Sequence, residues 1–74
     1  MHDQPSWVPA ARTALGCRIA SARTAARLSQ ERLAHIAGID RSTIQRIERG
    51  QNDARYSHLL RIARALDVPL RDLV

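Results

Sequence analysis

Apolar residues recur along most of this chain three or four positions apart, which is the spacing of a helix with one buried face. Short polar or glycine-containing segments separate these stretches, so four amphipathic helices are expected, over residues 10–26, 30–37, 41–49 and 56–66. A fifth, short helix is expected to follow Pro69 and to carry Leu70 and Leu73, since proline suits the first turn of a helix. No stretch alternates as a strand would, and the pattern predicts an all-α domain of five helices over residues 10–74.

The central segment, residues 28–50, carries the signals of two short helices joined by a tight turn. Ser29 is expected to cap the first helix with its side-chain oxygen, and Asp40 to cap the second. Gly38 lies between them, where a chain that leaves a helix often needs a positive φ. A helix, a glycine turn and a second helix in this space make the helix-turn-helix plan, in which the second helix enters the DNA major groove.

The first nine residues show no helical period and contain Pro5 and Pro9, so residues 1–9 are expected to form a flexible or extended arm. Trp7 lies in this arm. We expect it to fold back as a lid over the small core, and an arm that touches DNA or a partner is the alternative. Because Tyr56 is the only other aromatic residue, the core itself must be built from aliphatic side chains.

The chain has a net charge of +5 and a sequence pI of about 11.3, and all of its 12 Lys and Arg positions are arginines. A GC-rich genome, which favours Arg codons, explains the absence of lysine but not the positive balance. That balance supports a polyanionic partner, because the guanidinium fork pairs well with phosphate and with guanine. The single cysteine, Cys17, permits no internal disulfide and is expected to be a small buried hydrophobic residue.

Several classes of protein are disfavoured by the sequence. No apolar run approaches the roughly 20 residues of a membrane span, and the N-terminus lacks the basic start and apolar stretch of a signal peptide, so a cytoplasmic protein is expected. The histidines, His2, His35 and His58, lack metal-ligand spacing with one another or with Cys17. No catalytic constellation is visible either, so we expect no enzyme activity, no metal and no cofactor.

The helix expected over residues 41–49 has one face for the core and one for a ligand. On a helical wheel of about 100° per residue, Ile44 and Ile47 define the buried side. The opposite side and its flank carry residue types that read bases, because Arg matches guanine and Gln matches adenine; an ordinary solvated face is the alternative. The expected base contacts are Arg41, Ser42, Gln45 and Arg46. Phosphate contacts are expected from residues at helix starts or on this helix, namely Gln30, Thr43 and Arg49.

The chain resembles the phage-repressor-like helix-turn-helix family, of the Cro/C1 or XRE type, over about residues 15–73. The motifs that carry the resemblance are Leu28-Ser29-Gln30-Glu31, Leu33-Ala34, Ala37-Gly38-Ile39, Ser42-Thr43-Ile44 and Ile47-Glu48-Arg49-Gly50. It implies a compact, lambda-repressor-like five-helix domain that binds double-stranded operator DNA as a homodimer on an inverted repeat. It also implies a structural ion pair between Arg23 and Glu48 that ties the first helix to the third.

After Gly50 the chain departs from the family pattern, with Ala54 where proline is frequent and Arg55 in place of a small capping residue. Asn52 and Arg55 are therefore expected to contact phosphate, and Tyr56 to pack through its ring and reach phosphate with its hydroxyl. Longer members of the family continue into a ligand-binding or oligomerisation domain. The present sequence stops before one, so no inducer pocket is expected.

Two other functions remain open. A helix-turn-helix domain that docks on another protein would replace the Arg and Gln residues of the third helix by apolar or acidic ones, and this chain keeps them. A non-specific architectural binder would spread basic residues over several faces, and the arginines of the first helix fit that arrangement. Among regulators, a repressor, an antitoxin and a restriction–modification controller fit equally well. Leu60, Leu70 and Val74 are candidates for a dimer surface, unless they complete the core.

Overall fold

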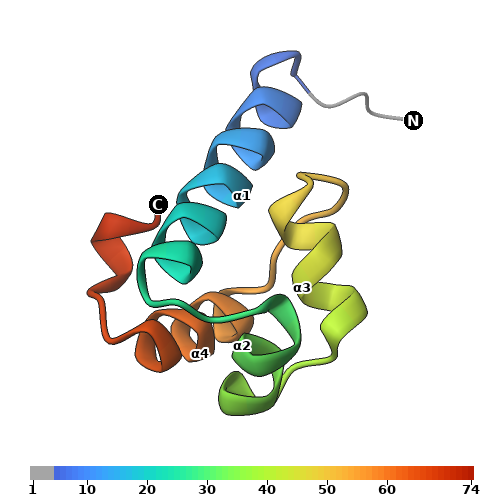
Figure 1. Cartoon of the computed structure of the whole chain (residues 1–74). Helices are drawn as coiled ribbons and strands as arrows, with labels where there is room; N and C mark the ends of the chain where they lie inside the picture. Colours follow the sequence, from blue (N-terminus) through green and yellow to red (C-terminus); the bar gives the residue numbers. More distant parts are fainter. Residues whose placement is uncertain (1–4) are drawn as a thin grey trace.

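Four α-helices and one 3₁₀ turn make up the fold in residues 5–74, the part of the chain that the computed structural model describes (Figure 1). The elements are α1 (Trp7–Ala25), α2 (Gln30–Ala37), α3 (Arg41–Glu48), α4 (Tyr56–Leu66) and η1 (Leu70–Asp72). α2 packs against both α3 and α4, while α1 packs mainly against α3 and η1 against α4. The all-α prediction is confirmed for this range.

The expected fifth helix is wrong, because η1 is a 3₁₀ turn of 3 residues. Pro69 lies just before this turn, and the backbone N–H of Leu73 donates to the carbonyl of Leu70, 2.9 Å away. A segment this short forms too few hydrogen bonds to offset the free-energy cost of starting an α-helix. Short connecting segments therefore often form a 3₁₀ turn instead. Leu73 is nevertheless buried, as a core residue should be.

α1 begins at Trp7, three residues before the expected start, so residues 7–9 are helical rather than part of an arm. Pro9 is tolerated there because the N–H groups of a first helical turn have no partner within the helix. The expected residues 1–4 of the arm lie outside the described range. The lid expected of Trp7 is also wrong: its side chain is 67% exposed, and the first turns of α1 extend beyond the other helices (Figure 1).

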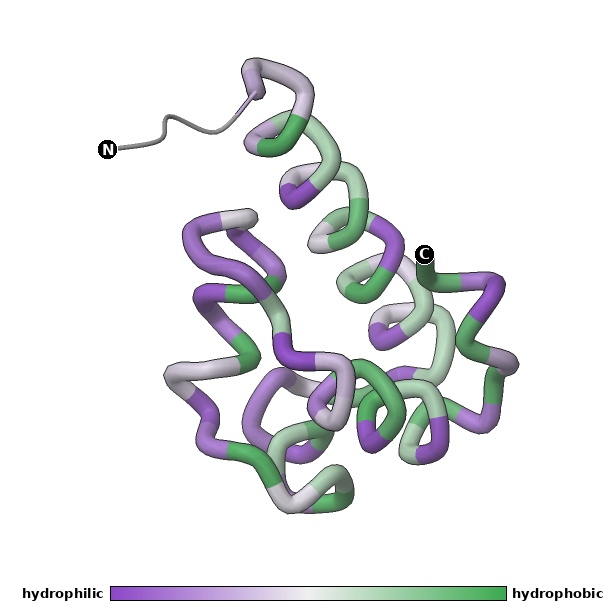
Figure 2. The backbone as a smooth tube through the Cα atoms, turned by 180° about the vertical axis from the view of Figure 1, so that it is seen from behind, coloured by the Kyte–Doolittle hydropathy of each residue, from purple (hydrophilic) through white to green (hydrophobic). Residues whose placement is uncertain are grey.

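The core is aliphatic, as expected, and every element contributes to it. Its fully buried large side chains are Ile19, Leu33, Ile44, Ile62 and Leu73. Apolar and polar residues are interspersed along each helix, as Figure 2 shows by colour. One expectation for α1 is wrong: Cys17 is exposed, because it lies about 160° around the helix from the buried Ile19.

The turn between α2 and α3 has most of the expected geometry. The hydroxyl of Ser29 accepts a hydrogen bond of 3.0 Å from the backbone N–H of Arg32, which confirms the predicted cap. Gly38 has φ +70°, which confirms the predicted glycine turn. Asp40, in contrast, makes no side-chain cap bond to α3, so that expectation is wrong; its backbone carbonyl accepts from the N–H of Ile44 instead.

α1 and α3 approach so closely that only glycine fits at their contact. A Cβ atom added to Gly16 would lie 2.4 Å from the carbonyl oxygen of Glu48 and 2.6 Å from that of Ile47. Both neighbours are backbone atoms, which cannot rotate away as a side chain would. Gly16 therefore fixes how near the end of α3 lies to α1.

Candidate nucleic-acid interface

The buried and the exposed sides of α3 carry the residues that the helical wheel predicts for them. Ile44 and Ile47 are buried in the core. Arg41, Ser42 and Arg46 are exposed, and Gln45 is partly buried at the flank of the exposed face. The four residues expected to meet base edges therefore stand on the side of α3 that the rest of the domain leaves free.

The carboxylate of Glu48 joins three helices. Arg23 of α1 donates to it twice, with Nε 2.8 Å from Oε2 and Nη2 3.1 Å from Oε1. Gln30, the first residue of α2, donates from Nε2 to Oε1 over 2.9 Å. Arg23 also donates from Nη1 to the carbonyl of Leu28 over 2.9 Å, which holds the segment before α2.

This cluster neutralises the one carboxylate within α3. The Glu48 side chain is only 5% exposed and that of Arg23 18%. The hydrogen bonds to Glu48 raise the pKa of Arg23 above its ordinary value, so the guanidinium stays charged. A fork-to-fork pair of this kind is strong and fixes orientation. The outward face of α3 thus carries positive charge, and the carboxylate that belongs to the helix itself is paired.

Gln30 has a second donor to offer. Its amide carries two N–H bonds, of which one is used on Glu48, and its backbone N–H is among the unpaired donors at the start of α2. The side chain is partly buried, so its orientation is set by the cluster. An oxyanion placed at this helix start would meet donors already held in position.

The remaining expected phosphate contacts lie along α3 and the segment that follows it. Thr43 and Asn52 are partly buried, while Arg49 and Arg55 are exposed. No hydrogen bond within residues 5–74 ties any of these side chains to the cluster around Glu48. Tyr56 is 66% exposed, so the expectation that its ring packs against the domain is wrong.

Two exposed ion pairs lie at the edge of the candidate interface, and neither was predicted from the sequence. Arg41 lies 3.7 Å from the Glu31 carboxylate of α2. Arg12 of α1 donates to Asp53 over 2.6 Å, a bond that lowers the pKa of Asp53 below its ordinary value. The partners are far apart in sequence and on different elements, so no helical spacing pointed to either pair.

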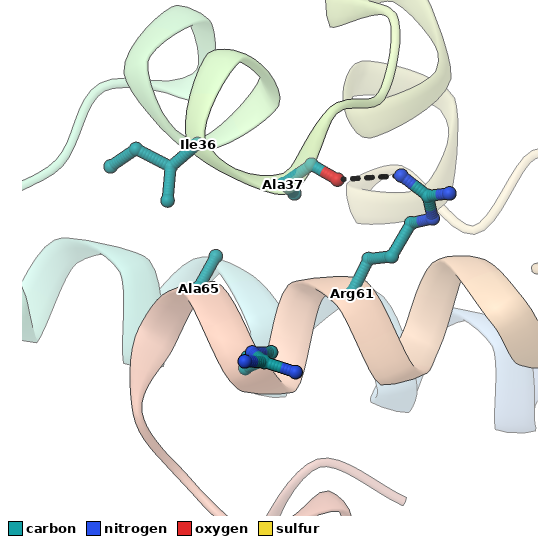
Figure 3. A pocket seen from close by; sticks show the side chains of 5 residues that line it. Ile36, Ala37, Arg61 and Ala65 are labelled. Atoms are coloured by element: carbon teal, nitrogen blue, oxygen red, sulfur yellow. Dashed lines mark hydrogen bonds between the residues drawn. The ribbon is translucent and has the colours of Figure 1, made fainter.

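A shallow groove runs between α2 and α4, away from the cluster (Figure 3). It has a volume of about 400 Å³ and is lined by Ile36, Ala37, Arg61, Arg64 and Ala65. Arg61 donates to the carbonyl of Ala37 over 3.4 Å, which places a cation at the C-terminal end of α2. Ile36 is 46% exposed beside it.

The described residues hold no group of three potential metal ligands. Within the same range no helix combines the length and apolar character that crossing a membrane requires.

The profile of the helix-turn-helix family matches residues 19–73. A protein of Rhodospirillum rubrum described as an uncharacterized transcriptional regulator in the ATPase CF(0) region is 45% identical over 56 residues. These residues are 76% of this chain and 52% of that protein, so the chain spans about half the length of this curated relative. The crystal structure of the restriction-modification controller protein C.AhdI from Aeromonas hydrophila is similar over 88% of this chain and 98% of its own, with 42% identity and a TM-score of 0.86.

Proposed function

Because the chain belongs to the helix-turn-helix family of the XRE type, we propose that it is a sequence-specific regulator of transcription that binds double-stranded DNA. The fold is that of a DNA-binding regulator family and not of an enzyme family. The relative in Rhodospirillum rubrum carries the description of a transcriptional regulator, which supports the same role here.

The observation that carries the proposal is the exposed face of α3 beside a neutralised Glu48. An unpaired carboxylate in α3 would repel phosphate, and here it is tied to Arg23. Arg46 and its neighbours are free to enter the major groove and donate to base edges. We assign base contacts to Arg41, Ser42, Gln45 and Arg46.

Phosphate contacts complete the proposed interface and set its register on the duplex without reading sequence. Gln30 would use its free amide N–H and the start of α2, where the helix dipole favours an anion. Arg41, assigned to bases, is loosely paired with Glu31 across 3.7 Å, and an exposed pair of this kind contributes so little that it need not keep Arg41 from DNA. The other phosphate contacts that we assign are Thr43, Arg49, Asn52, Arg55 and Tyr56.

One recognition helix contacts few base pairs, so we propose a homodimer on an inverted repeat, with half-sites about 34 Å apart. The protein would act in the cytoplasm, on the nucleoid, and most simply as a repressor. The likeness to a restriction–modification controller, at 42% identity, favours a controller role over an antitoxin.

A second candidate function is docking on another protein, and the groove between α2 and α4 supports it. Arg61 and Arg64 line this groove together with the apolar side chains of Ile36 and Ala65, and Figure 3 shows the groove from close by. An acidic helix with apolar residues on one face would complement such a surface.

Selection from a random duplex library separates these functions. At moderate salt, we expect enrichment of an inverted repeat whose half-site spacing matches one helical turn. A control with Arg41→Ala and Arg46→Ala together is expected to enrich nothing. Failure of the unaltered protein to enrich any sequence, with binding that disappears as salt rises, would leave only phosphate attraction and favour the docking function.

A further inference from the structure

The segment that joins α3 to α4, residues 50–55, has little regular structure of its own. Residues 52–55 belong to no helix, and within residues 5–74 none of their N–H groups donates to a backbone carbonyl. This part of the chain, the connecting segment below, carries Asn52 and Arg55, two of the residues assigned to phosphate. A segment without backbone hydrogen bonds takes its conformation from its contacts with the rest of the domain.

Two contacts hold the connecting segment against the first half of α1. Arg12 donates from Nε to Oδ1 of Asp53 over 2.6 Å. At the start of the segment the two backbones touch, because a Cβ atom added to Gly50 would lie 2.9 Å from both the N and the Cα of Thr13. Figure 1 shows the chain turning back beside α1 after it leaves α3. The half of α1 that extends beyond the other helices is therefore in contact with this segment.

Asn52 lies between these two contacts in the chain. Its Oδ1 is buried and has no hydrogen-bond partner within residues 5–74. A buried acceptor without a partner costs free energy, so the contacts on either side must hold the amide where it is. In this orientation the amide offers its N–H donors to a ligand, and a phosphate is bound by donors.

We propose that the pair of Arg12 and Asp53 is a clamp, which keeps the connecting segment in the conformation that presents Asn52 and Arg55 to a DNA phosphate. Arg12 and Asp53 are positioning residues in this role, and neither has to touch DNA. The pair also neutralises a carboxylate that is next to Asn52 in the chain and would otherwise repel phosphate. The clamp rests on the proposed function, because the phosphate contacts are part of that proposal.

The sign of the expected effect separates a clamp from an ordinary surface ion pair. An exposed pair adds little to the stability of the fold, and it can bias the conformation of the segment by no more than that, which corresponds to roughly two- to fivefold in DNA affinity for each copy bound. Removing Asp53 takes away a negative charge, so without a clamp its loss would leave DNA binding unchanged or strengthen it. A clamp predicts weaker binding.

Fluorescence anisotropy at moderate salt, on an enriched and on a random duplex, measures this sign. Asp53→Ala and Arg12→Ala are each expected to weaken binding to both duplexes roughly two- to fivefold for each copy, while urea denaturation changes little. The double variant should bind no worse than either single variant, since all three lose the same contact. Asp53→Glu keeps a carboxylate for Arg12 and should retain the affinity. The matched control is Asp72→Ala, which removes an exposed carboxylate from η1 and should not weaken binding.

Backbone amide relaxation in NMR measures the clamp without DNA. Asp53→Ala is expected to increase the fast motion of residues 50–55, and Asp72→Ala to leave it unchanged. Three results overturn the proposal and leave the DNA function standing: unchanged or tighter DNA binding by Asp53→Ala, effects that add in the double variant, or a segment that moves no more than before. A loosened segment in a protein that enriches no duplex would support the clamp and overturn the DNA function.

Discussion

The guanidinium of Arg23 and the carboxylate of Glu48 meet at two points, across 2.8 and 3.1 Å, and so connect the last turn of the chain's first helix to the end of its third. Gln30 donates to the same carboxylate from the start of α2. The orientation of α3 is therefore fixed by one side chain that two other helices hold. The contact at Glu48 therefore matters for both the fold and the proposed function, because α3 carries the residues assigned to base contacts.

Removing Glu48 should destabilise the domain markedly. Breaking a buried pair costs about 3–5 kcal/mol, and because Arg23 stays partly in contact with solvent, we expect Glu48→Ala to lower the free energy of unfolding by about 2–3 kcal/mol. Urea denaturation measures this. Asp53→Ala, which breaks the exposed pair with Arg12, is the control and should change stability far less. Equal losses in the two variants would mean that the Glu48 cluster is not a structural centre.

Gly16→Ala tests the close approach of α1 and α3. The added methyl would stand 2.4 Å from a backbone oxygen, so the helices must separate, and we expect a loss of about 2–3 kcal/mol as for other overpacked sites. Alanine is the better helix former, so any loss arises from the contact alone. Ser21→Ala, on the exposed side of the same helix, should lie within about 0.5 kcal/mol of the unaltered protein. Unchanged stability in Gly16→Ala would contradict the packing described above.

The pair of Arg12 and Asp53 predicts a stability change in acid. Arg12 lowers the pKa of Asp53 in the folded state, so this contribution is complete above the unfolded value of about 3.9 and is lost as pH falls through the lower folded value. Titration of the Asp53 carboxyl by NMR should give a pKa below the ordinary one and return it to normal in Arg12→Ala. Arg23, whose pKa is raised, adds no such dependence between about pH 5 and 9. An unshifted Asp53 in the unaltered protein would show that the pair is not formed in solution.

Gln30→Ala should weaken binding to all DNA sequences alike, because its proposed contact is with phosphate. We expect a loss of several-fold, comparable to one hydrogen bond of about 1 kcal/mol, on specific and random duplexes. Fluorescence anisotropy at fixed salt measures both. A changed base preference in a repeated library selection would show that Gln30 reads bases. Gln30→Ala also loses the hydrogen bond to Glu48. Urea denaturation of the variant measures how much that loss lowers its stability, so that this effect is separated from the effect on DNA binding.

The sequence was informative where a structural signal is local. Ser29 and Gly38 mark the ends of α2, and the spacing of Ile44 and Ile47 separates the two sides of α3. A long-range contact leaves no such pattern, and the resemblance to a family was needed to pair Arg23 with Glu48. The bond from Gln30 to Glu48 joins residues 18 apart in different helices and was not expected.

Errors in the prediction arose where two local signals compete or where the outcome depends on packing. Pro9 was interpreted as a break, although a proline in a first turn is harmless. Gly16 went unnoticed because a lone glycine in an alanine-rich helix signals a close contact only once its neighbour is known. Trp7 was expected to fold back as a lid over the core, but it begins α1, which extends past the other helices (Figure 1), and it is exposed.

The affinity of Arg46→Ala for an enriched duplex and for a scrambled duplex of equal length tests the central claim most directly. Since Arg46 stands on the exposed face of α3 and a good base contact contributes about 1–3 kcal/mol, we predict a loss of roughly tenfold to a hundredfold on the enriched duplex and a much smaller one on the scrambled duplex. Arg64→Ala, which removes the same charge from α4, should reduce both affinities slightly and alike. Equal losses on both duplexes for Arg46→Ala would contradict the account, because α3 would then attract DNA without reading it.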